Sequence, residues 1–257
     1  MILKELKRQT FSLGMLLALI VGLIMLTIGR FGEIKTYFSL GIKIDYDYLR
    51  TLTGALTSGG FLVFTPLVVV LPGVIQFCDD YNYGYSRLII TRVSKKNYLL
   101  QRYIATIIAG GIACMLPLLV ITIYALITKE APTEYNNFSY CEIYNRFIDL
   151  WDGKAVMFHI CLFGFIFGMV WSSIGMMFAV IIPNRYVALG LPVAIFFVAN
   201  IICNLFMDKG GYKFSPVNMI FVDVQDSIVH VIVYQTVLLL TSGVIYLLVG
   251  NRRLKNA

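Results

Sequence analysis

Long apolar runs alternate with short polar segments along this chain. A helix needs about 20 apolar residues to cross the hydrocarbon core of a bilayer, and six runs are close to that length or exceed it. We expect one transmembrane helix in each run: residues 11–29, 59–77, 103–127, 155–182, 187–206 and 228–249. The pattern therefore predicts an all-α, multi-pass membrane protein in which residues 1–257 form a single transmembrane domain.

The composition indicates the same class. Of the 257 residues, 59% are hydrophobic and only 14% are charged, and the mean hydropathy is +0.80. In soluble domains about a quarter of the residues are charged, so the composition excludes a soluble globular protein. The formal net charge of +7 requires no nucleic-acid partner, because the cytoplasmic loops of membrane proteins are enriched in lysine and arginine.

Charge also predicts the orientation of the spans. If the N-terminus lies inside, three basic clusters fall immediately beside spans on the inner side, within residues 4–8, 87–102 and 252–255. Basic residues of this kind mark the cytoplasmic side. We therefore expect both termini in the cytoplasm and the chain in the cytoplasmic (inner) membrane of the cell, in contact with lipid.

The remaining segments give less definite expectations. Residues 1–10 combine isoleucine and leucine with lysine and arginine, which is typical of a short amphipathic helix that rests on the inner membrane surface. We expect the segments 30–58 and 128–154 outside, the first of them partly helical. The connector 207–227 mixes charged and apolar residues, which indicates a pair of short interfacial or re-entrant helices.

The most charge-dense inner segment lies between spans two and three, over residues 78–102. It contains the acidic pair Asp79 and Asp80, the turn-permissive Gly84, and the basic residues Arg87, Arg92, Lys95, Lys96 and Arg102. A helix over about residues 85–97 would gather Leu88 and its apolar neighbours into a stripe flanked by basic side chains. Such a helix can face acidic headgroups or a soluble partner. The alternative is a solvated loop whose basic residues only reflect the enrichment of lysine and arginine on the cytoplasmic side.

Small residues and prolines within the spans indicate close packing and bending. Span four carries small residues at nearly four-residue spacing, which lets two helices approach closely: Gly164, Gly168, Ser172 and Gly175. In span two, Pro66 and Pro72 remove backbone donors and predict a kink.

Few residues are placed for catalysis or metal binding. His159 and His230 fall near the outer ends of their spans and have no histidine or carboxylate at ligand spacing. Asp79 and Asp80 are adjacent, so on a helix they diverge by about 100° and form no carboxylate dyad. The five cysteines are scattered, which argues against a disulfide framework or a metal site: Cys78, Cys114, Cys141, Cys161 and Cys203. A phosphate-binding G-x-x-x-x-G-K-[ST] motif is absent, so we predict no catalytic residue, metal or cofactor in this chain.

The segment between spans two and three resembles a pattern found in one family of transporters. An acidic residue ends span two, a glycine follows, and a basic and apolar stretch then leads to a small residue and a basic pair. The matching residues are Asp80, Gly84, Arg87, Leu88, Thr91, Arg92, Ser94, Lys95 and Lys96. Together with the six-span layout, this pattern is similar to that of the integral-membrane permease subunits of ABC exporters of the second type.

The resemblance implies a cytoplasmic coupling helix between spans two and three, on which separate ABC ATPase subunits would dock. The coupling residues would be Asp79, Asp80, Gly84, Arg87, Leu88, Arg92, Lys95 and Lys96. It also implies a second permease subunit, in a homodimer or a heterodimer, with ATP and magnesium bound only by the ATPase. The apolar spans favour a hydrophobic or amphipathic cargo, such as an antimicrobial peptide, a lipid or a drug. The alternatives are a non-catalytic scaffold or channel subunit and an intramembrane hydrolase.

Overall fold

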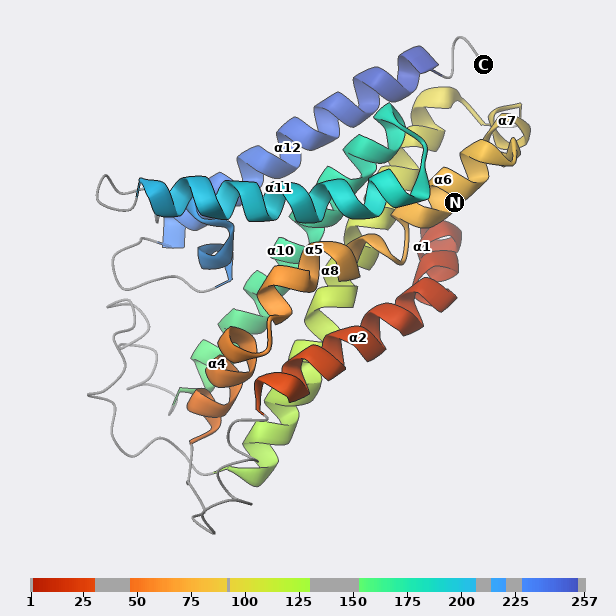
Figure 1. Ribbon diagram of the computed structural model, residues 1–257. Coiled ribbons are helices and arrows are strands. Elements are labelled where there is room, and N and C mark those ends of the chain that lie inside the picture. Colours follow the sequence, from red (N-terminus) through yellow and green to blue (C-terminus); the bar gives the residue numbers. More distant parts are fainter. Residues whose placement is uncertain are drawn as a thin grey trace.

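The structure is a computed structural model, and it describes residues 2–30, 47–91, 93–129, 153–206, 214–220 and 228–253. Every regular element in these ranges is helical (Figure 1). In chain order the elements are α1 (Ile2–Thr10), α2 (Leu13–Gly29), α4 (Tyr48–Ser58), α5 (Phe61–Val70), α6 (Val74–Asn82), α7 (Tyr85–Ile90), α8 (Lys95–Thr128), α10 (Lys154–Ile181), α11 (Arg185–Leu205), the 3-10 turn η4 (Pro216–Met219) and α12 (Ile228–Arg253).

Within the described ranges, five helical segments are long and apolar enough to cross a membrane: α5 with α6, α8, α10, α11 and α12. A sixth crossing is possible if α1 and α2, which meet at a bend of 51°, are counted together. These lengths and compositions are compatible with a multi-pass membrane protein. The expected count of six therefore depends on α2, an apolar helix of 17 residues.

The second predicted span is a broken helix. Thr65 and Pro66 lie within α5, which ends at Val70, and α6 begins at Val74. Pro72 cannot donate a backbone hydrogen bond, so the break falls at the second of the two prolines. The backbone of α2 approaches this break closely, because a Cβ added to Gly14 would collide with the carbonyl group of Leu71.

Helix α4 belongs to the packed bundle, although the sequence suggested an external segment for residues 30–58. Its leucines at positions 49, 52 and 56 are almost completely buried, and they repeat at the spacing of one helix face. A Cβ on Gly59 would overlap the carbonyl oxygen of Met25, so glycines allow α2 to pack against the end of α4. Residues 31–46 of this segment lie outside the described ranges.

Helices α8 and α10 form the centre of the bundle, and α12 packs on α10. Helix α11 packs on α10, α5 and α6, and it buries Ala188, Pro192 and Phe196 on its inner face. Phe196 meets the buried Trp171 of α10 with 5.3 Å between ring centroids. The turn η4 folds back onto α11 and α12, where the Gln235 amide donates to the Met219 carbonyl at 2.7 Å. The rest of the connector 207–227 is outside the described ranges.

One end of the bundle gathers segments from the whole sequence. Both marked termini, α1 and α7 lie at this end, on the right of Figure 1. The short turn between α10 and α11 also lies at this end, because the Asn82 amide at the end of α6 donates a hydrogen bond to the Pro183 carbonyl in that turn. The last turn of α12 also reaches it, since Arg253 donates to the carbonyl of Ile181, at the end of α10. We call this region the α7 end.

Candidate functional site at the α7 end

The turn between α6 and α7 is built on glycine. Gly84 has a φ of +75°, in the left-handed region that residues with a side chain rarely adopt. An added Cβ would meet no atom within 4 Å, so the backbone conformation and not the lack of space requires glycine here. The residue turns the chain from the end of α6 into α7.

The predicted helix over residues 85–97 is wrong in length. Helix α7 ends at Ile90, and α8 begins at Lys95 after Ser94, whose ψ of 139° is not helical. Serine is a favoured residue at a helix N-cap, and the β-branched Thr91 and Val93 are weak helix formers. Lys95 and Lys96 therefore open the helix of span three, and they do not belong to a continuous coupling helix.

Helix α7 lies with one face on the bundle and one face outward. Ser86 is buried, and Ile89 and Ile90 pack against the core. Tyr85 and Leu88 point outward, with 66% of Leu88 exposed. The side chain of Arg87 and the whole of residue 92 lie outside what the structure describes. The described part of α7 thus presents an aromatic and an aliphatic side chain on the surface.

A buried ion cluster connects α6 to α8 and α1. Arg102 of α8 has a side chain that is only 2% exposed, and its Nη2 lies 3.0 Å from Oδ2 of Asp80. Arg102 also pairs with Glu5, while Arg8 pairs with both Glu5 and Asp80. Two carboxylates therefore balance two guanidinium groups, which is the condition for keeping a charge such as Arg102 away from water.

Helix α1 is fixed to the bundle by its polar side. Gln9 is fully buried, and its Nε2 donates to the Thr106 hydroxyl at 3.1 Å and to Glu5 at 3.3 Å. A Cβ on Gly73 would lie 2.7 Å from the Gln9 oxygen, so the helix break in span two makes room for this side chain. Leu3 remains 79% exposed. The expected amphipathic helix is present, and it directs Glu5 and Gln9 towards α8.

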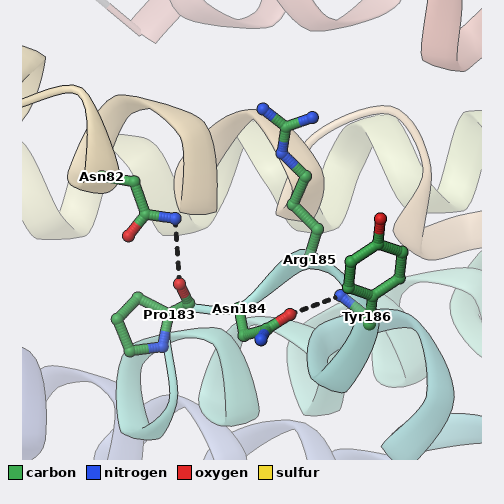
Figure 2. A pocket seen from close by; sticks show the side chains of 5 residues that line it. All are labelled: Asn82, Pro183, Asn184, Arg185 and Tyr186. Atoms are coloured by element: carbon green, nitrogen blue, oxygen red, sulfur yellow. Dashed lines mark hydrogen bonds between the residues drawn. The ribbon is translucent and has the colours of Figure 1, made fainter.

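The second acidic residue, Asp79, faces another helix. It pairs with Arg185 at the start of α11. Nearby, the Asn82 amide donates to the Pro183 carbonyl at 3.0 Å, and Arg185 donates to the Tyr83 hydroxyl at 3.3 Å. Figure 2 shows Asn82 pointing at the Pro183 carbonyl, and Asn184 capping α11 at the backbone nitrogen of Tyr186. The adjacent carboxylates Asp79 and Asp80 therefore serve different helices, Asp79 through Arg185 of α11 and Asp80 through Arg102 of α8 and Arg8 of α1.

Three of the four predicted packing residues lie between α10 and α8. A Cβ on Gly168 would lie 2.6 Å from the carbonyl oxygen of Gly110, and one on Gly164 would collide with Leu118. Ser172 occupies the space that a Cβ on Gly110 would need. The fourth residue, Gly175, faces α5 instead, where its Cβ would lie 2.7 Å from Val70.

The described residues bring together no metal-binding group of three or more His, Cys, Asp or Glu side chains. His159 and His230 each make an edge-to-face contact with a phenylalanine, Phe163 and Phe214. The four cysteines in the described ranges are free thiols, and Cys141 lies outside those ranges. Sequence reasoning found neither Glu5 nor Arg8 as a site residue and assigned Arg102 no partner. Arg8 and Glu5 are only three residues apart, but their bonds to Asp80 and Arg102 join positions 72 and 97 residues apart, and nothing local in the sequence marks those two contacts.

Comparison of the chain with known protein families, with curated proteins and with solved structures gives no match.

Proposed function

We propose that this chain is the permease subunit of an ATP-driven ABC exporter, moved by separate ATPase subunits that dock on α7 and its flanking residues. One observation carries the proposal. The segment between the second and third spans is closed on itself by the Asp80–Arg102 pair and is bound by ion pairs to two other helices, through Asp79 to α11 and through Asp80 to α1.

These contacts make α7 suited to transmitting a displacement. The helix is short, has one face on the bundle, and is joined to α6 and α8 by only a few residues. A partner that pushes on the exposed Tyr85 and Leu88 therefore acts on the ends of two spans at once. Packed helices shift as units between discrete arrangements, so such a push would reach α5–α6 and α11 together.

The distribution of charge supports docking from the cytoplasm. The α7 end carries the basic clusters that predict the inner side of the membrane, and both termini lie there (Figure 1). An even number of crossings would put both termini on the same side of the membrane, and α1 and α2 would together form the first crossing. The partner would be a cytoplasmic ATPase, and its ATP would be bound outside this chain.

The transport cycle would use two permease subunits, identical or homologous, around a shared path. Nucleotide binding would draw the ATPases together and move α7, and the spans would open the path alternately to the two sides. The spans are apolar, and α11 and α12 display wide apolar faces. A hydrophobic or amphipathic cargo fits these surfaces: a peptide with antimicrobial activity, a lipid or a drug.

The test is a double charge reversal, Arg87→Glu with Arg92→Glu, in a chain purified from its native cells together with any ABC ATPase that binds it. We expect the ATPase to copurify with the wild-type chain, and we expect the variant to lose most of its ATPase copurification and of its transport. The matched control is Arg252→Glu with Lys255→Glu, a double reversal in the C-terminal basic cluster, which we also expect on the inner side of the membrane. Unaided transport by the purified chain, or a double variant that assembles and transports normally, would overturn the proposal.

A further inference from the structure

Helix α11 is the least embedded of the apolar helices in the described ranges. Of its most apolar 18-residue stretch, only 17% is buried inside the structure, whereas 61% of the corresponding stretch is buried in α8 and in α10. Its core contacts lie on one face, where Ala188, Pro192 and Phe196 are buried and Leu189 and Ile195 pack partly buried beside them. A helix that touches its neighbours on one face only can tilt more readily than a helix that is surrounded.

The first part of α11 also contains a weak point. Pro192 has no backbone N–H, so it cannot donate to the carbonyl of Ala188, and prolines inside helices are common positions of kinks. Two residues earlier, Gly190 has no neighbouring atom within 4 Å of an added Cβ. The segment from Arg185 to Gly190 can therefore change direction relative to the rest of the helix.

The ion pair that holds this segment to α6 is only partly enclosed. Asp79 and Arg185 form an ion pair in which 47% of the arginine side chain and 30% of the aspartate are exposed. The pair between Asp80 and Arg102 is far more enclosed, with 15% and 2% exposed. Water can replace an exposed partner at little cost, whereas a buried guanidinium cannot lose its carboxylate so easily.

We propose that the Asp79–Arg185 pair, with the neighbouring Asn82–Pro183 hydrogen bond, is a latch that opens when α11 moves away from α6. The Asp80–Arg102 pair stays closed and keeps α6 attached to α8. The two adjacent aspartates thereby divide the α7 end into a part that moves and a part that does not. The use of the latch in a transport cycle rests on the proposed function, but its existence does not.

The test measures the distance between α7 and α11 in the full-length chain in lipid nanodiscs. Spin labels are placed on cysteines at the exposed positions Tyr85 and Tyr186, with the five native cysteines replaced by alanine. We expect one narrow distance distribution in the otherwise wild-type chain. Arg185→Gln, and independently Asp79→Asn, should add a second population that is longer by about 5 Å or more, the scale of one helical turn.

Two further variants show whether the ion pair is responsible. The charge exchange Asp79→Arg with Arg185→Asp should restore the narrow distribution. Arg252→Gln, which changes an exposed arginine on α12, should leave it as in the wild type. An unchanged distribution in both single variants, or no restoration by the exchange, would overturn the latch.

The same label pair is then measured with the ATPase and a non-hydrolysable ATP analogue. A shift towards the longer population supports opening during the cycle, and an unchanged distribution with the ATPase bound contradicts it. Failure of the ATPase to bind would count against the proposed function alone, because the measurements on the isolated chain test the latch without a partner.

Discussion

Nη2 of Arg102 lies 3.0 Å from Oδ2 of Asp80, and the arginine side chain is almost completely enclosed. The two residues stand at the two ends of the segment that contains α7, one near the end of α6 and the other near the start of α8. Their contact closes the base of this segment. The helix α7 is consequently presented by a closed loop whose two ends are held together by charge.

Asp80→Asn should destabilise the protein. The substitution removes one of the two carboxylates of the buried Arg102 and leaves Glu5 as its partner, so the cost should stay below the roughly 3–5 kcal/mol of a buried charge that loses its only partner. We expect a clearly lower midpoint of thermal unfolding in detergent micelles. Asp79→Asn alters the exposed pair of the neighbouring residue and should lower the midpoint much less. Equal effects of the two substitutions would contradict the assignment of the buried cluster to Asp80.

Gly168→Ala should disturb the contact between α8 and α10. The new methyl group would lie 2.6 Å from the carbonyl oxygen of Gly110, which belongs to the backbone and cannot rotate away. Overpacking of this kind costs about 1–3 kcal/mol. Gly190→Ala is the matched control, since its methyl group would meet no atom within 4 Å, and alanine favours helix more than glycine does. The measurement is the unfolding midpoint, which should fall for the first variant and stay unchanged or rise for the second.

Tyr103→Phe should weaken the packing of α8 against α10 and α12. The Tyr103 hydroxyl lies 2.6 Å from the Ser173 hydroxyl and donates to the Leu239 carbonyl at 3.0 Å. Its removal takes one hydrogen bond from each of two groups that keep Ser242 as a partner, at a cost of about 0.5–1.5 kcal/mol. Tyr186→Phe removes a hydroxyl from a side chain that is highly exposed and should be nearly neutral. A Tyr103→Phe variant as stable as Tyr186→Phe would show that the buried hydroxyl contributes little.

The orientation of the chain can be mapped by cysteine labelling in intact cells. We expect cysteines placed at Lys96 and Asn184 to resist a membrane-impermeant maleimide until the cells are opened. A cysteine at Thr128, at the far end of α8, should react from outside. All three positions are exposed, so differences in burial cannot explain the result. Labelling of position 96 from the exterior would reverse the predicted topology.

The sequence predicted the long apolar helices because a long uninterrupted apolar run marks such a helix directly. It placed the start of span three at residue 103, whereas α8 begins at Lys95. The first two turns of α8 carry Lys95, Lys96 and Arg102, and a polar helix gives no hydropathy signal. Helix α4 was assigned to a polar external segment for a related reason, since its threonines and glycine lower the mean hydropathy although one face is buried.

The candidate site was only partly predictable. The acidic pair and Gly84 were recognised from their order along the chain, but the partners of the two aspartates depend on how distant helices meet. Arg8 lies 72 residues before Asp80, and Arg185, at the start of α11, is separated from Asp79 by α7, α8 and α10 among the described helices. The break between α7 and α8 was missed because the helical spacing of Ile89 and Val93 continues across it. Ser94 was the local signal for a new helix start.

The backbone contact between Gly168 and Gly110 has a practical consequence for later work. Small residues let two helices approach until their main chains meet, so a shift of α8 towards α10 at this point would push the Gly110 carbonyl oxygen against Gly168. The pair α8 and α10 is therefore the natural reference frame for superposing other states of this molecule, and displacements of α11 or α6 should be measured against it.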